Sequence, residues 1–205
     1  GTISGAGAPG NPAPSYFPVV LREGTTKITG GTYAVNGEMV LGGVVNHGDE
    51  GFDNLLQMDG GTLNISSWFS IGRGNGTGSR SSNVVLNNSS VITCANLSAG
   101  FNGGNAANLP KGSITLNNSS SLIDSGNFYL GESPGSVMTM TLNGSSSLAA
   151  SSGGQHRIGA GGAGTMILNG TSSVTFSGNT NGNGSLAVYV GYGAGSGYLE
   201  VNNGA

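Results

Sequence analysis

Short runs in which apolar and polar residues alternate recur along the chain, and each run is followed by residues that favour turns. Met138-Thr139-Met140-Thr141-Leu142 is one such run, and Asn143-Gly144 follows it. Alternation with a period of two is typical of β-strands that bury one face. The pattern therefore predicts an all-β protein made of many short strands.

One motif, an apolar residue followed by a polar turn, returns at intervals of 26 to 33 residues. A clear copy is Thr141-Leu142-Asn143-Gly144-Ser145-Ser146-Ser147-Leu148. Such a period is too long for a heptad and is typical of one coil of a solenoid. The apolar anchors of the copies are Ile28, Met58, Leu86, Leu116, Leu142, Leu168 and Val201.

A second motif, an apolar residue before glycine, occurs once between successive anchors, as in Leu130-Gly131 and Ile158-Gly159. Each coil is thus expected to hold three short strands. Asn-Gly is also a hairpin signal, which would favour an antiparallel sandwich. Because the motifs return in unchanged order, we favour a right-handed parallel β-solenoid of about six coils, with the hand taken from the rule for parallel crossovers. The turn asparagines are expected to stack as a ladder.

The composition limits the kinds of partner that the protein is expected to bind. The chain has 41 glycines, only 7% charged residues and a net charge of −3, so it lacks the basic stripe that nucleic acid requires. No apolar run is long enough to predict a membrane helix. Cys94 is the single cysteine and is expected to be a small buried residue. The start at Gly1, without a leader, suits a processed secreted product or an excerpt of a longer one.

Residues 1–25 differ from the repeats and are interpreted as a proline-containing extended arm with an entry strand, and residues 26–205 as the solenoid domain. The last repeat ends halfway. We hypothesise that the arm or first coil of another subunit completes it, which would give a head-to-tail filament by strand addition. Neighbouring coils of a longer solenoid are the alternative. The residues expected at this contact are Tyr16, Phe17, Val19, Val20, Leu21, Leu199 and Val201.

Few residues of the sequence are candidates for a catalytic, metal-binding or ligand-binding site. Asp49, Glu50 and Asp53 cluster in a glycine-rich loop, where calcium binding is conceivable but a solvated loop is the preferred interpretation. The two histidines lie far apart in sequence and near no nucleophile motif. We therefore predict no enzyme activity, no cofactor and no firm metal site. Aromatic residues near the third strand could stack on sugars, although several are expected to be core or ladder residues: Trp68, Tyr129, Tyr189 and Tyr192.

Two segments carry a family resemblance: IGAGGAGTMILNG at residues 158–170 and VGYGAGSGYLEVNNGA at residues 190–205. They resemble repeats of type V autotransporter passengers and of PEP-CTERM surface proteins of bacteria, over roughly residues 26–205. The resemblance implies an exported bacterial protein with a parallel β-solenoid and an adhesive, surface-layer or matrix role. It supplies no catalytic residues. Neither a C-terminal barrel nor a sorting helix with a basic tail is found in these 205 residues, so either would lie outside this chain.

These observations rank three functions. First is an extracellular structural or adhesive protein of the cell surface that self-assembles into a filament. A glycan-binding module is second, and a polysaccharide-degrading β-helix enzyme is third. The shortage of acidic residues that cluster across coils places the enzyme last.

Overall fold

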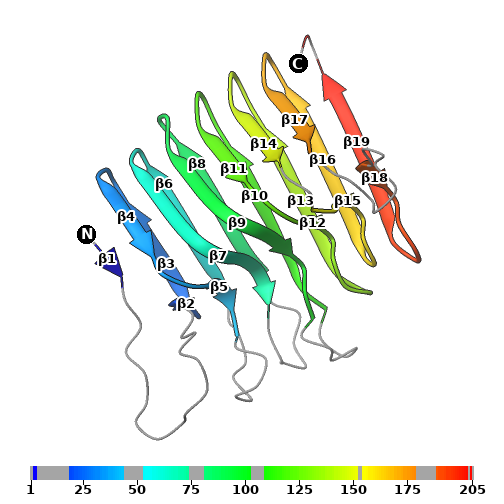
Figure 1. Cartoon of the computed structure of the whole chain (residues 1–205), viewed down its shortest axis with the longest axis horizontal. Helices are drawn as coiled ribbons and strands as arrows, with labels where there is room; N and C mark the ends of the chain where they lie inside the picture. Colours follow the sequence, from blue (N-terminus) through cyan, green and yellow to red (C-terminus); the bar gives the residue numbers. More distant parts are fainter. Residues whose placement is uncertain are drawn as a thin grey trace, which may run out of the picture.

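The computed structural model describes residues 2–3, 19–43, 53–73, 81–102, 109–151, 154–178, 188–202 and 204. This part of the chain contains strands and turns but no helix. All strand pairs within it are parallel, so the hairpin alternative is wrong and the chain is a parallel β-solenoid. Its coils follow one another in sequence order, with the two termini at opposite ends of the stack (Figure 1).

The first strand of every coil belongs to a seven-stranded sheet, here called the first column. Its register places all seven predicted anchors in one line, from Ile28 at one end to Val201 at the other. The prediction of about six coils is therefore close. The first column consists of β3 (Gly24–Ile28), β6 (Asn54–Asp59), β8 (Ser81–Asn87), β10 (Lys111–Leu116), β13 (Val137–Leu142), β16 (Ala163–Asn169) and β19 (Ser196–Asn202).

The remaining strands form a second sheet of two columns. The second column consists of β1 (Thr2–Ile3), β4 (Thr32–Val35), β7 (Thr62–Arg73), β9 (Val91–Ala99), β11 (Ser121–Asp124), β14 (Ser147–Ser151) and β17 (Ser173–Ser177). The third column consists of β2 (Val19–Leu21), β5 (Met39–Gly42), the later parts of β7 and β9, β12 (Phe128–Leu130), β15 (His156–Ile158) and β18 (Val188–Val190).

Two details differ from the sequence-based expectation. In two coils the second and third strands are one continuous strand, β7 or β9, and the register between this pair shifts between Ile65 and Trp68. In addition, the arm is not wholly outside the solenoid, because Thr2 and Ile3 pair with Ala34 and Val35 of β4. The entry strand β2 pairs with β5 in the third column. The N-terminal segment thus contributes part of a coil ahead of β3.

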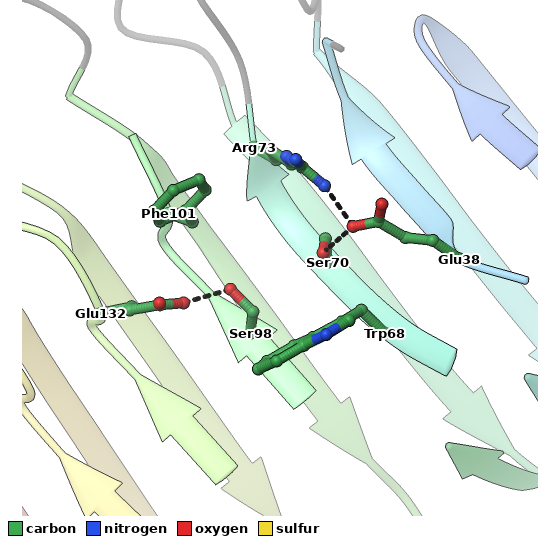
Figure 2. A pocket seen from close by; sticks show the side chains of 7 residues that line it. All are labelled: Glu38, Trp68, Ser70, Arg73, Ser98, Phe101 and Glu132. Carbon is green, nitrogen blue, oxygen red and sulfur yellow. Dashed lines mark hydrogen bonds and ion pairs between the residues drawn. The ribbon is translucent and has the colours of Figure 1, made fainter. Parts of the chain in front are cut away.

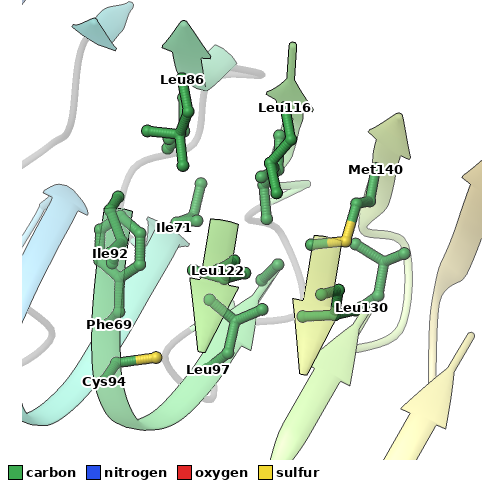
Figure 3. Packing of buried hydrophobic residues seen from close by; sticks show 14 of the residues in the cluster. Phe69, Ile71, Leu86, Ile92, Cys94, Leu97, Leu116, Leu122, Leu130 and Met140 are labelled. Atoms are coloured by element: carbon green, nitrogen blue, oxygen red, sulfur yellow. The ribbon is translucent and has the colours of Figure 1, made fainter. Parts of the chain in front are cut away.

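The interior is a continuous apolar core that no coil could form alone. Side chains from successive coils, including Leu86, Leu116, Ile92 and Leu122, point into the same interior (Figure 3). Equivalent residues lie directly above one another because the strands stack in register at roughly 4.8 Å per coil. Cys94 is buried in this core as a free cysteine, as expected.

The asparagine ladder is present along the edge of the first column. The side-chain Nδ2 of Asn117 donates to Oδ1 of Asn87 at 2.9 Å, and Asn143 donates to Asn117 at 2.9 Å. The same bond joins Asn169 to Asn143 at 2.9 Å and Asn202 to Asn169 at 3.0 Å. Each amide therefore hydrogen-bonds to the equivalent amide of the next coil, which links the turns to one another.

The turn after each ladder residue requires a left-handed backbone. Asn118 has a φ of 60°, and the equivalent residues of the next two coils are Gly144 and Gly170, with φ of 68° and 73°. Asparagine and glycine are the residues that adopt this conformation at least cost.

We expect Asn118→Ala to lower the free energy of unfolding by about 1 kcal/mol, because alanine is disfavoured at positive φ. Asn118→Gly should leave stability unchanged or raise it slightly. Urea denaturation of the two variants beside the wild type measures the difference. Equal stabilities for the alanine and glycine variants would show that the backbone conformation at this turn carries no cost.

Candidate functional site

The outer surface of the third column holds a hollow of about 240 Å³. Figure 2 shows the side chains around it, with Glu38 and Glu132 on opposite sides and Trp68 across from Arg73 and Phe101. The hollow is lined by Glu38, Trp68, Ser70, Arg73, Ser98, Phe101 and Glu132.

Two small residues create the hollow. Along the outward-facing row of the third column, Val40, Ser70, Ser98 and Tyr129 occupy equivalent positions in successive coils. The two serines are shorter than the residues on either side of them in the row, so they form a floor between taller neighbours. Their hydroxyls also bind the acids, since Ser70 donates to Oε1 of Glu38 at 2.7 Å. Ser98 makes the matching bond to Oε2 of Glu132.

The charges of the hollow are largely matched within it. Arg73 at the end of β7 forms an ion pair with Glu38 from the preceding coil, and both side chains are about four-fifths covered. The same guanidinium lies over the ring of Phe101, 5.6 Å from its centroid. A planar guanidinium is suited to this double role, since it forms hydrogen bonds at its edge and stacks on its face.

Burial gives Glu132 an altered acidity. Loss of solvent around its carboxyl raises the pKa above its usual value, while the Ser98 hydrogen bond and the charges of Arg73 and Arg157 oppose that rise. A carboxyl in this environment can accept hydrogen bonds from a ligand and carries its charge at a cost. The arrangement is that of a polar anchor within a partly apolar recess.

An aromatic and cationic row extends from the hollow along the third column. Trp68 and Tyr129 lie with ring centroids 6.4 Å apart and planes inclined by 21°. Arg157, in the next coil, has its guanidinium 5.6 Å from the centroid of Tyr129 and 3.7 Å from that of Tyr192. Tyr189 packs edge-on against Tyr192 at 5.0 Å.

The sequence correctly placed these four aromatic residues near the third strand. None of the four is a core residue, because Trp68, Tyr129 and Tyr189 are only half-buried and Tyr192 is exposed. The stacking of Trp68 on Tyr129 across coils agrees instead with the expectation of ladder residues. The hollow itself was not predicted from the sequence. Its one signal was that Ser70 and Ser98 occupy the position before the apolar-glycine motif, where later coils carry Tyr or Arg.

The calcium hypothesis gains no support. Asp49 and Glu50 lie outside the described residues, and Asp53 is exposed and accepts a hydrogen bond from the backbone N–H of Ser81 at 2.8 Å. Within the part of the chain that the structure describes, no three His, Cys, Asp or Glu residues are grouped to hold a metal ion.

No protein-family model, curated protein or solved structure matches the chain. Nor do the described residues include a helix long and apolar enough to cross a membrane.

The two acids of the hollow come from different coils. Glu38 precedes β5 and Glu132 follows β12, three coil steps further on. At roughly 4.8 Å per step their backbones are about 14 Å apart along the axis. Their side chains reach inward, and each carboxyl is held by a serine of the floor.

The residues predicted for assembly divide between the two ends. Tyr16 and Phe17 lie outside the described residues. Val19, Val20 and Leu21 form β2 at the N-terminal end, whereas Leu199 and Val201 lie in β19 at the C-terminal end. We call β1, β2 and β3 the head of the solenoid and β17, β18 and β19 its tail.

Proposed function

We propose that the protein is an extracellular structural subunit of the bacterial surface that stacks head to tail into a filament. The observation that supports this most strongly is that, among the described residues, head and tail are complementary partial coils. The last strand of the tail, β19, belongs to the first column, while β1 and β2 of the head belong to the second and third columns. Placed end to end, these three strands make up one coil.

The same stacking pairs every open edge. Among the described residues, each head and tail strand pairs with a neighbouring coil on one side only. In a head-to-tail contact, β1 would extend the column of β17, β2 that of β18, and β3 that of β19. Open strand edges are ready templates for such parallel addition. Because the contact is heterologous, it propagates as a fibre and does not close.

The tail also exposes core positions. Leu199 and Val201 are 45% and 57% exposed, although the equivalent residues of the preceding coil, Met166 and Leu168, are buried. Val188 and Val190 of β18 are exposed in the same way above His156 and Ile158. Covering these side chains with another coil would remove apolar surface from water.

Charge at the two ends is complementary. Lys27 in β3 and Glu200 in β19 occupy the same row of the first column, since the pairings from Lys27 to Gln57 continue coil by coil to Glu200. In-register stacking would therefore set Lys27 of one subunit beside Glu200 of the next. Opposite charges at such a contact favour this register over a slipped one.

An extracellular, structural role also fits the general chemistry. The family resemblance implies export, and the described strands are held together by the asparagine ladder and a long shared core. The low charge leaves broad neutral surfaces.

We expect Val201→Asp to prevent assembly, because it would place a charge at the apolar centre of the contact. Sedimentation velocity and negative-stain electron microscopy over a concentration series measure the effect. Val137→Asp is the matched control, as Val137 is 48% exposed but lies on the side of the stack in β13. Assembly that survives Val201→Asp, or that fails equally in both variants, would contradict the proposal.

A charge exchange tests the register. Lys27→Glu and Glu200→Lys should each raise the concentration needed for assembly by a few-fold, and the double variant should recover most of the loss. Lys27 also pairs with Asp59 of its own chain at 3.0 Å, so the recovery will be incomplete. Lys111→Glu, on the side of the stack, controls for a change in net charge. Additive losses in the double variant would exclude this register.

A further inference from the structure

We infer that the hollow on the third column binds neutral hexose units of a polysaccharide chain. This inference is independent of end-to-end assembly, because the residues that carry it lie between β5 and β12, away from the head and the tail. The sugar chain would lie on the outer surface of the third column.

The apolar part of the hollow suits a sugar ring. Trp68 and Phe101 are half-buried and lie on different sides of the recess, with the Ser70 and Ser98 floor between them (Figure 2). One face of a pyranose carries C–H groups, which pack on the electron-rich face of an aromatic ring. Tyr129, stacked beside Trp68, extends that platform by one ring.

The polar part suits hydroxyl groups. Each carboxylate has one oxygen engaged by a serine, and a carboxylate has room for roughly four hydrogen bonds in all, so Glu38 and Glu132 retain acceptor capacity. Arg73 adds donors on the opposite side from Trp68. A few placed polar groups in a mainly apolar recess are the usual means of fixing ligand orientation.

The volume and the charges define the ligand class. At about 240 Å³ the hollow is smaller than the roughly 300 to 1,000 Å³ of sites that enclose drug-sized molecules. It therefore accommodates one or two sugar rings rather than a whole ligand. The Arg73–Glu38 pair neutralises its own charge. Glu132 carries the charge that is left over and would repel an anionic sugar.

The row beyond the hollow indicates a chain rather than a free sugar. Tyr129, Arg157 and Tyr192 continue the platform into later coils, parallel to the axis of the stack. Neighbouring sugar units of an extended polymer would lie on these planar groups. Several weak contacts along one chain add to a useful affinity.

The protein contains one tryptophan, so its fluorescence reports on this site directly. We expect cellohexaose, laminarihexaose or maltohexaose at millimolar concentration to shift Trp68 emission in a saturable way. Hexagalacturonate should have no effect, because Glu132 would repel its carboxylates. If no neutral hexasaccharide changes the emission or releases heat in calorimetry, or if only the anionic sugar does, the inference is wrong.

Variants then test the residues, with binding followed by calorimetry. Phe101→Ala and Glu132→Gln should each weaken binding of the active hexasaccharide about tenfold or more. Tyr198→Ala is the control, because Tyr198 is an exposed aromatic residue on β19 in the first column. Circular dichroism confirms that each variant keeps its sheet content. Unchanged affinity in both hollow variants, or equal loss in the control, would place the sugar elsewhere and overturn the assignment.

Discussion

Replacing Asp124 by asparagine is expected to abolish the loss of stability that this carboxyl causes as the pH rises from about pH 4 to about pH 7. Asp124 lies in β11 with no exposed surface, and its side chain points into the core beside Cys94, whose Sγ is 3.9 Å from Oδ1. Its Oδ2 has no hydrogen-bond partner among the described residues. Burial raises the pKa of this carboxyl from 3.8 to about 7, opposed by hydrogen bonds from Gly126 and Cys94.

The direction of this pH dependence follows from the linkage between proton binding and folding. The folded protein holds the Asp124 proton more tightly than the unfolded chain, so the folded state bears no penalty below about pH 4. Stability is then lost as the pH rises, and the loss is complete above about pH 7. A shift of roughly three pKa units corresponds to about 4 kcal/mol. The asparagine side chain would carry no charge at any pH, so the variant should be similar to wild type at low pH and more stable above neutrality.

Chemical denaturation of the wild type and Asp124→Asn at a series of pH values measures this difference. Glu23→Gln is the control, because Glu23 is an exposed carboxylate, and it should keep the slope of the wild type. Parallel pH profiles for the wild type and Asp124→Asn would show that this carboxyl is not the source of the dependence.

Gly131→Ala is expected to cost about 2 to 5 kcal/mol. Gly131 follows the third strand of its coil with a φ of 73°, where alanine costs about 1 to 2 kcal/mol. A Cβ at this position would also lie 2.5 Å from the backbone oxygen of Ala163 in the next coil. Backbone cannot move aside as a side chain can, which adds about 1 to 3 kcal/mol.

A second glycine, Gly24, separates the cost of the backbone conformation from the cost of the steric clash. Gly24 has nearly the same φ, 76°, but a Cβ there would meet no atom within 4 Å. Gly24→Ala should therefore cost only the backbone term, about 1 to 2 kcal/mol. Urea denaturation of both variants measures the difference between them. Equal losses would mean that close stacking of the coils does not explain the glycine after each third strand.

The order and alignment of the strands were predictable from the sequence because stacking requires equivalent residues at equivalent positions in every coil. Each anchor must lie on the one before it, so the spacing of Leu116, Leu142 and Leu168 in sequence reproduces their alignment in space. The Asn117 ladder followed for the same reason. Periodicity in the sequence expresses these contacts because they join equivalent positions.

Features that break the repeat were not predictable in this way. Asp124 shares its row with Cys94 and Ala150, and only an alignment of the second strands shows that it faces inward. The hollow depends on residues from four successive coils, which sequence spacing alone does not bring together. Pairing of Thr2 and Ile3 with β4 involves two residues without a repeat signature.

The measurement that tests head-to-tail stacking most directly is the helical rise of the assembled protein by electron cryo-microscopy. If β3 of one subunit follows β19 of another, each subunit adds seven strands to the first column, or about 34 Å at roughly 4.8 Å per strand. We expect filaments with this rise and an unbroken stack of strands across each junction. Separate short rods at all concentrations, or filaments whose repeat contains two subunits in opposite orientations, would contradict the account.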